Sequence, residues 1–261
     1  MDLQLKNKRA LVSGSTAGIG YAIAEALVRE RAAVIVNGRA QKAVDEAVGK
    51  LKPLGSVIGF AGDLSTAEGA AALAKAHPDV DIVVNNLGIF EPKDFEQIPD
   101  ADWTRFFEIN VLSGVRLARA YLPGMRKRDW GRIIFISSES GVQIPAEMVH
   151  YGMTKSAQIS IARGIAEAVA GTGITVNSVL PGPTKSRGVV DFVDALAKAD
   201  NKSFDAFEKE FFEKVRPTSL IKRFATPEEV ASLVAYVASP LSSATTGAAL
   251  RVDGGTIKSA F

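Results

Sequence analysis

The stretch Ser13-Gly14-Ser15-Thr16-Ala17-Gly18-Ile19-Gly20 decides the fold. It follows a short apolar run, residues 9–13, and leads into an Ala- and Leu-rich run with helical spacing. Glycine permits positive φ and lets the backbone approach a pyrophosphate without a Cβ clash. A helix that begins here offers unpaired N–H groups and its positive dipole end to the phosphates. The G-x-x-x-G-x-G spacing lies one residue off the usual dinucleotide fingerprint. It predicts nucleotide contacts at Gly14, Ser15, Thr16, Gly18, Ile19 and Gly20.

Outward from this loop, short β-branched runs alternate with longer helical stretches. The predicted strands are residues 9–13, 33–37, 57–60, 80–84, 132–136 and 174–179, with a last strand closed by Val252. Runs that are apolar at almost every position, such as residues 80–84, indicate burial on both faces and a parallel sheet. The pattern predicts an α/β fold, a Rossmann-type doubly wound parallel sheet of about seven strands with helices on both faces.

Bulk properties narrow the function. The 261 residues, with no linker or internal repeat, predict a single domain over residues 1–261. A net charge of +2 without a dense Lys/Arg block argues against nucleic-acid or membrane-surface partners. With no cysteine and two histidines, we expect no metal site. The N-terminal residues lack a signal-peptide core and no apolar run could span a bilayer, so we expect a cytoplasmic protein.

One region interrupts the alternation of strands and helices. Residues 183–217 contain two helical pieces, 189–198 and 204–215, with no strand between them. Because loops after the carboxyl ends of strands surround the ligand crevice of such sheets, we interpret residues 183–217 as a substrate lid. A structural helical hairpin is the alternative.

The end of the second strand bears on the choice of cofactor. An NAD-binding protein usually places Asp or Glu there to hold the ribose 2′-hydroxyl. This chain has Arg39 after Gly38 instead, and a guanidinium pairs well with a 2′-phosphate. Arg39 therefore favours NADP(H) over NAD(H); a solvated arginine at the start of the next helix is the alternative.

Further motifs resemble the short-chain dehydrogenase/reductase superfamily over essentially the whole chain. They are Asp63-Leu64, Asn85-Asn86-Leu87-Gly88, Asn110, Ser138, Tyr151-Gly152-Met153-Thr154-Lys155, Pro181-Gly182 and Val252-Asp253-Gly254-Gly255. The resemblance implies cofactor contacts at Asp63, Leu64, Asn86, Gly88, Tyr151, Lys155, Pro181, Gly182 and Thr184. It also implies a catalytic set of Asn110, Ser138, Tyr151 and Lys155. The chain departs from the family at Arg31, where a glycine usually ends the first helix in a left-handed conformation.

The chemistry can be argued from the residues. Tyr151 and Lys155 are i, i+4 on a helix and share a face. A nearby ammonium and an oxidised nicotinamide would lower the phenol pKa from about 10, which makes Tyr151 a general acid in reduction and a general base in oxidation. Ser138 would hydrogen-bond the substrate oxygen. The resemblance implies that Lys155 holds the ribose and that Asn110 connects Lys155 to solvent through a water. We expect His150 to be structural and Glu139 and Glu147 to be surface carboxylates.

We therefore predict hydride transfer between NADP(H) and a carbonyl or secondary alcohol. Phe192, Phe204, Phe207, Phe211 and Phe212 in the lid favour a small-molecule substrate with an apolar part. A 3-oxoacyl-[acyl-carrier-protein] reductase, for which Arg126, Lys127 and Arg128 offer a docking patch, is the alternative; a non-catalytic nucleotide-binding regulator and a methyltransferase fit less well. The resemblance implies a homotetramer or homodimer that pairs the helices around residues 103–128 and 151–170.

Overall fold

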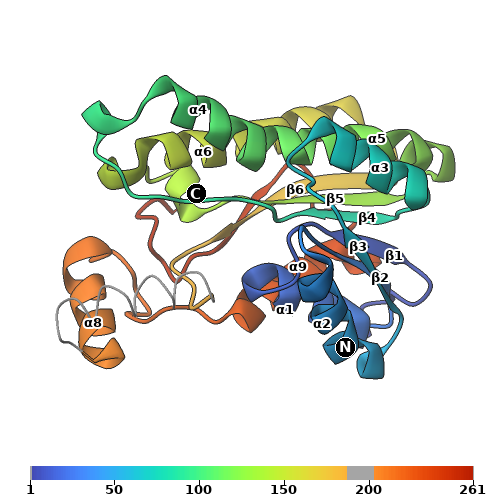
Figure 1. The fold of residues 1–261 in the computed structure, drawn as a ribbon, viewed down its shortest axis with the longest axis horizontal. Helices are drawn as coiled ribbons and strands as arrows, with labels where there is room; N and C mark the ends of the chain where they lie inside the picture. The colour runs from blue at the N-terminus through green and yellow to red at the C-terminus, as the bar shows by residue number, and fades with distance from the viewer. Residues whose placement is uncertain (1, 187–202, 261) are drawn as a thin grey trace.

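The computed structural model describes residues 2–186 and 203–260. In these residues the chain forms a seven-stranded parallel sheet in the order β3-β2-β1-β4-β5-β6-β7 (Figure 1). The strands are β1 (Arg9–Val12), β2 (Ala33–Gly38), β3 (Val57–Ala61), β4 (Ile82–Asn85), β5 (Gly131–Ile136), β6 (Ile174–Pro181) and β7 (Ala249–Val252). The predicted doubly wound sheet is confirmed.

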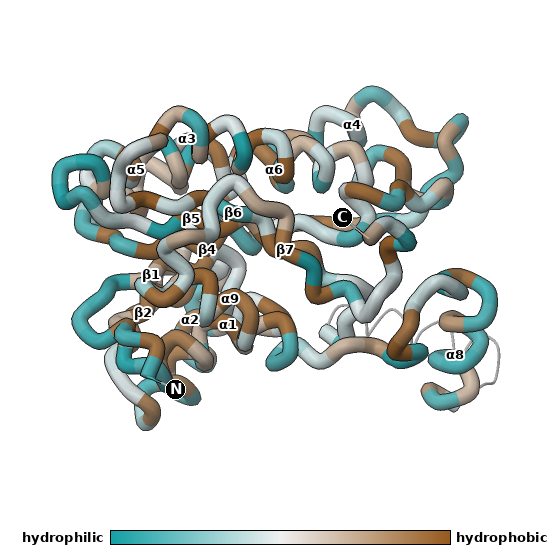
Figure 2. The backbone as a smooth tube through the Cα atoms, turned by 180° about the vertical axis from the view of Figure 1, so that it is seen from behind, coloured by the Kyte–Doolittle hydropathy of each residue, from teal (hydrophilic) through white to brown (hydrophobic). Residues whose placement is uncertain are grey.

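Helices cover both faces of this sheet. One face carries α1 (Gly18–Arg29), α2 (Gln41–Leu51) and α9 (Pro227–Ala238) (Figure 1). The other face carries α3 (Ala67–Ala76), α4 (Asp100–Phe107), α5 (Ser113–Arg128) and α6 (Val149–Ala168). Beyond these layers stands α8 (Phe204–Glu210), which continues into a π-helical turn, Phe211–Val215. Hydrophobic residues are concentrated along the strands and the helices packed on them (Figure 2).

Burial along the strands follows from these two layers. Every residue of β4, β5 and β6 is buried, whereas the outer strands β3 and β7 each expose residues. A strand covered on both faces is mostly apolar, which is why residues 80–84 read as a nearly continuous hydrophobic run.

The strand order reverses between β1 and β4: the chain adds β2 and β3 on one side of β1, and β4 to β7 on the other side. These two strands are adjacent in the sheet but far apart in the sequence. Their register pairs Leu11 with Val83 and Val12 with Val84, so both strands end at the same edge. A crevice opens beyond the carboxyl ends of strands at such a switch point. The glycine loop follows β1 and the Asn86 segment follows β4, so both reach this crevice.

The structure refines the boundaries that the sequence predicts. The fourth strand begins at Ile82 instead of Val80, and the predicted helix over residues 204–215 changes from α-helix to a π turn at Phe211. The predicted helical piece at residues 189–198, and Phe192 with it, lies outside the described residues. Among the residues that are described, no helix is long and apolar enough to cross a membrane.

Candidate active site

The glycine loop joins β1 to α1 through two left-handed glycines. Gly14 has φ 61° and Gly18 has φ 58°, a conformation that side chains with a Cβ rarely adopt. Gly20 is required for space: a Cβ there would lie 2.4 Å from Asn86 Nδ2 and 2.5 Å from the Gly14 carbonyl oxygen. The loop is thus shaped so that backbone atoms pass close to one another at the start of α1.

Side chains from the neighbouring strands hold this loop. Asn86 Nδ2 donates to the carbonyl oxygens of Ser13 and Gly14, each at 3.0 Å. Ser13 Oγ in turn accepts hydrogen bonds from the Asn86 and Leu87 backbone N–H groups, each at 3.0 Å. Asn86 therefore organises the loop from within the protein, a role that its motif alone did not specify.

Asn37 is a second anchor of the loop, and the sequence analysis missed it. Its Oδ1 accepts from the Gly14 N–H at 3.1 Å, and its Nδ2 donates to the carbonyl oxygens of Phe60 and Gly62, both at 3.1 Å. Its backbone N–H donates to Ser15 Oγ at 2.9 Å. The available signal was a polar residue at the end of an otherwise apolar buried strand, because a buried amide must find partners.

Among the other residues predicted to bind the cofactor, Arg39, Asp63 and Thr184 can offer side chains to it, and Leu64 cannot. Arg39 is exposed just beyond β2 and lies near Asp63, whose pKa its charge helps to lower; hydrogen bonds from Ser65 make the larger contribution. Thr184 lies on the rim of the crevice, where its hydroxyl donates to the Gly182 carbonyl oxygen at 2.8 Å. Leu64, by contrast, is 1% exposed and its side chain belongs to the hydrophobic core, so it can offer a nucleotide only its backbone.

These features fit a dinucleotide. The first turn of α1 has no side-chain cap, so within the described chain its N–H groups stay available to a phosphate. At Gly88 an added Cβ would lie 3.4 Å from Asn110 Oδ1 and 3.6 Å from Lys155 Nζ, so the backbone reaches the catalytic group there without an intervening side chain. The chain therefore offers a phosphate cradle at one end and a small residue beside the predicted catalytic residues at the other.

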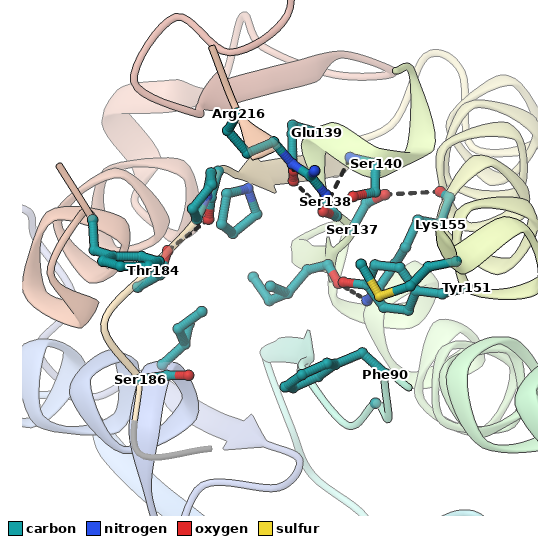
Figure 3. Close-up of a pocket in the computed structure, with 18 of the residues that line it drawn as sticks. Phe90, Ser137, Ser138, Glu139, Ser140, Tyr151, Lys155, Thr184, Ser186 and Arg216 are labelled. Atoms are coloured by element: carbon teal, nitrogen blue, oxygen red, sulfur yellow. Dashed lines mark hydrogen bonds and ion pairs between the residues drawn. The ribbon is translucent and has the colours of Figure 1, made fainter. Parts of the chain in front are cut away.

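A cavity of about 490 Å³ continues from this cradle. Its lining includes Ile19, Asn86 and Gly88 from the cradle, and it also includes Ser138, Tyr151 and Lys155. Figure 3 shows Ser138, Tyr151 and Lys155 directed toward the same space. The structure thus brings these three predicted residues together at the carboxyl end of β5 and the start of α6.

The pKa of Tyr151 differs from the expectation, which was that it would be lowered. In the protein chain the pKa of Tyr151 is raised, first by burial and then by the negative charge of Glu139. The neighbouring Ser138 hydroxyl and the charge of Arg216 act in the lowering direction. The expected lowering by Lys155 was wrong for the chain by itself, since Lys155 is not among the groups that lower this pKa. Its ammonium donates to other acceptors.

Those acceptors are buried with Lys155. Its Nζ donates to the Ile136 carbonyl oxygen at 2.9 Å and to Gln158 Oε1 at 3.2 Å. Burial lowers the pKa of Lys155 to about 8. Lys155 therefore loses its positive charge at a lower pH than an exposed lysine, whose pKa is about 10.4.

Gln158 connects Lys155 to Asn110 directly. While its Oε1 accepts from Lys155, its Nε2 donates to the Asn110 carbonyl oxygen at 2.6 Å. Asn110 lies in a π-helical turn, Glu108–Leu112, and its side chain bonds the backbone of Ile89. The connection from Lys155 to solvent through a water at Asn110 stays a prediction. Gln158, which the sequence analysis missed, could have been found from its i+3 spacing to Lys155.

Glu139 is the clearest correction to the sequence analysis. The expectation of a surface carboxylate was wrong: the Glu139 side chain is 7% exposed, and Ser138 Oγ donates to its Oε2 at 2.5 Å. Arg216 Nε lies 3.5 Å from Glu139 Oε1, and Arg216 Nη1 lies 3.0 Å from Glu147 Oε1. A 3₁₀ turn that begins at Glu139 turns the chain directly after Ser138 and buries the carboxylate. Glu147, 44% exposed, remains on the surface but pairs with Arg216.

The phenylalanines of the predicted lid form one cluster. Phe212 and Phe224 are buried, and Phe204, Phe207 and Phe211 pack against them. Phe207, Phe211 and Phe224 also line the cavity. The same aromatic cluster therefore attaches α8 to the body and gives the cavity an apolar wall.

His150 lies outside the cavity, although it adjoins Tyr151. Its ring centroid is 4.1 Å from that of Phe106 and 6.1 Å from that of Trp103, and it is fully buried. Burial lowers the pKa of His150, and neither ring nitrogen has a hydrogen-bond partner among the described residues. This environment agrees with the structural assignment of His150.

Known proteins share both the sequence and the fold. A family model described as enoyl-(acyl carrier protein) reductase matches residues 14–256. The uncharacterized oxidoreductase YvrD of Bacillus subtilis is 50% identical over 262 residues, covering 99% of this chain and 100% of that protein.

Two solved structures resemble the chain closely. L-sorbose reductase from Gluconobacter frateurii, complexed with NADPH and L-sorbose, superposes with a TM-score of 0.94 at 31% identity, covering 99% of this chain and 100% of that one. A 7α-hydroxysteroid dehydrogenase complexed with NADH gives a TM-score of 0.85 at 28% identity, covering 99% of this chain and 97% of that one. Structures of this fold thus bind either nicotinamide cofactor.

Proposed function

This chain belongs to the short-chain dehydrogenase/reductase family, and from that premise we propose that it is an NADP(H)-dependent enzyme that reduces a carbonyl group or oxidises the corresponding secondary alcohol. One observation carries the proposal. Ser138, Tyr151 and Lys155 line a single cavity together with Ile19, Asn86 and Gly88 beside the glycine cradle. A carbonyl in that cavity would meet the hydroxyls of Ser138 and Tyr151 beside the cofactor end.

The residues divide the work of proton transfer. NADP(H) supplies or accepts the hydride. Tyr151 donates the proton to the carbonyl oxygen in reduction and takes it back in oxidation. Ser138 donates a hydrogen bond to the same oxygen as negative charge develops on it. In the chain alone, burial and Glu139 raise the pKa of Tyr151. With the cofactor bound, the oxidised nicotinamide and the ammonium of Lys155, which Gln158 holds, would act in the lowering direction.

Arg39 supports NADP(H) as the cofactor. It is exposed at the end of β2, where a 2′-phosphate would lie beside the adenosine ribose. We expect NADPH to bind at least about tenfold more tightly than NADH, about 1.4 kcal/mol. Calorimetric titration with each cofactor at one ionic strength tests this, and Arg39→Ala should remove the preference without weakening NADH. Equal affinities in the unchanged protein would contradict the assignment to NADP(H).

The same titration tests the proposal that this is an enzyme. Protein that binds neither cofactor would favour a regulatory scaffold. Protein that binds NADPH and oxidises it in the presence of ketones supports the enzyme.

A small-molecule substrate with an apolar part fits the cavity better than a protein-bound thioester. Phe207, Phe211 and Phe224 supply the apolar wall. Of the basic residues that could dock an acyl carrier protein, Arg126 already donates to the Ala168 carbonyl oxygen at 2.5 Å, and Arg128 donates to the Val80 carbonyl oxygen at 2.7 Å. Faster turnover of a 3-oxoacyl-carrier-protein thioester than of a free ketone would overturn this preference.

We also infer a homotetramer or homodimer in which α5 and α6 pair across a two-fold axis. Size-exclusion chromatography with light scattering tests this inference. A monomeric mass at micromolar concentration would contradict it.

A further inference from the structure

The Glu139 carboxylate is a charged group in the cavity to which the mechanism gives no task. It is buried, it lines the cavity, and it lies next to the hydroxyl that must bind the substrate oxygen. Burying a carboxylate is costly unless hydrogen bonds or an opposite charge compensate. A group of this kind beside the reacting centre therefore calls for an explanation in terms of the substrate.

The Glu139 carboxylate accepts fewer hydrogen bonds than it has room for. Within residues 2–186 and 203–260, its direct partners are Ser138 on Oε2 and Arg216 on Oε1. An ionised carboxylate offers about four lone-pair positions and can only accept. The carboxylate thus has room for another donor, and Figure 3 shows it with Ser138 and Arg216 on one wall of the cavity.

Ser138 cannot serve Glu139 and a substrate carbonyl at the same time. A serine hydroxyl has one hydrogen, and in this structure Ser138 donates it to Glu139. When a ketone binds, that hydrogen must turn to the carbonyl oxygen, and Glu139 loses its donor. An unpaired buried acceptor costs free energy, more so when it is charged.

A substrate hydroxyl on the carbon next to the carbonyl would replace the lost donor. Its oxygen lies within about one hydrogen-bond length of the carbonyl oxygen, as Glu139 Oε2 lies within one of Ser138 Oγ. We propose that Glu139 is a specificity-determining residue that selects α-hydroxyketones, or in the reverse direction vicinal diols, by accepting this neighbouring hydroxyl. The inference rests on the proposed function.

The charges of the same wall disfavour a keto acid. Arg216 is the cation there, and it is already shared between Glu139 and Glu147. A substrate carboxylate in the place of the hydroxyl would face Glu139 directly, and like charges at such distances repel. A neutral donor is therefore preferred to an anion.

Three aromatic ketones test the proposal on one molecular frame. Acetophenone lacks the neighbouring group, α-hydroxyacetophenone carries the hydroxyl, and phenylglyoxylate carries a carboxylate. The phenyl ring suits the wall formed by Phe207 and Phe211. With NADPH at saturation, we expect kcat/KM for α-hydroxyacetophenone to exceed that for acetophenone at least about tenfold, the size of one hydrogen bond to a charged group, and phenylglyoxylate to be the poorest.

Two matched variants locate the source of the preference. Glu139→Gln removes the charge beside Ser138, whereas Glu147→Gln removes a charge from the other side of Arg216 without touching Ser138. We expect Glu139→Gln to lose the preference for the hydroxyketone over acetophenone, and Glu147→Gln to keep it. Melting temperature and NADPH affinity, measured on each variant, show that the comparison is made on folded protein.

Each other outcome overturns a distinct statement. If Glu139→Gln lowers kcat/KM equally for both ketones, Glu139 positions Ser138 and selects nothing. If the unchanged protein reduces acetophenone or phenylglyoxylate at least as well as the hydroxyketone, the specificity proposal fails and the proposed function stands. If protein that binds NADPH reduces no carbonyl compound, the proposed function fails and takes the inference with it.

Discussion

The cradle side and the Ser138 side of the cavity are built by different means. The cradle is made of glycines and short polar side chains that bond mainly to backbone, as Asn37 and Asn86 do. The Ser138 side is made of long charged or aromatic side chains, including Glu139, Arg216 and Phe211, that meet from distant parts of the chain. The cradle suits the cofactor, whose shape is always the same. The side chains of the Ser138 side can be replaced to suit different substrates.

If this division is real, changes on the Ser138 side should affect turnover far more than cofactor affinity. Ser138→Ala removes a donor to the developing negative charge and should lower kcat/KM about 10²–10³-fold. NADPH affinity should stay within about twofold, because the Ser138 hydroxyl contacts the substrate oxygen in the transition state and is not proposed to contact the cofactor. Ser140→Ala, on the next turn, is the control and should lose much less. Equal losses in both variants would indicate general damage to the loop.

Changes in the cradle should show the opposite pattern. Gly20→Ala places a Cβ 2.4 Å from Asn86 Nδ2 and 2.5 Å from the Gly14 carbonyl oxygen. We expect a loss of about 1–3 kcal/mol, shared between stability and NADPH affinity. At Gly49 a Cβ would meet nothing within 4 Å, so Gly49→Ala should be neutral or stabilising by up to about 1 kcal/mol. Denaturant unfolding and calorimetry measure both; a harmless Gly20→Ala would contradict the account of the loop.

Gln158 sharpens the comparison because it bonds Lys155, a residue of the Ser138 side, without lining the cavity itself. The pKa of Lys155 is about 8, so its positive charge is present below that pH and lost above it. Carbonyl reduction should therefore decline as the pH rises through about 8. Gln158→Leu removes an acceptor from the ammonium and should lower the pKa of Lys155, moving the decline about one pH unit down. Gln158→Glu should move it up.

The pH dependence of kcat/KM checks this prediction. The two substitutions should shift the profile in opposite directions. An unmoved profile in both variants would show that Gln158 is only a packing residue.

Arg31 lies away from both sides of the cavity, so a substitution there should change stability slightly and leave turnover unchanged. Arg31 follows the end of α1 and has φ 68°, so the chain keeps the left-handed conformation at the position where the family usually has glycine. Arg31→Gly should stabilise the protein by about 1 kcal/mol without altering turnover. The lost ion pair with Asp2 is exposed and contributes little, which Asp2→Asn alone would show. A destabilised Arg31→Gly would mean that the strain is relieved in another way.

The sequence predicted what local patterns encode. The alternation of strands and helices, the glycine loop and the helical spacing of Tyr151 and Lys155 follow from periodicity and backbone sterics, and the structure places them as expected. Glu139 was misjudged because its burial depends on a 3₁₀ turn and on Arg216, which no local pattern reveals. Asn37 was missed because its partners lie on other elements. Gln158 was missed because its second partner, Asn110, lies on another element, although Lys155 is on its own helix.

Tyr151 is proposed to perform the proton transfer, while the glycine cradle beside the cavity provides most of the affinity for the cofactor. The most direct test measures NADPH oxidation and NADPH affinity side by side for the unchanged protein and for Tyr151→Phe, with the best ketone of the three as substrate. The account predicts that turnover falls about 10²–10⁴-fold while NADPH affinity changes little. Turnover that survives in Tyr151→Phe would contradict the mechanism.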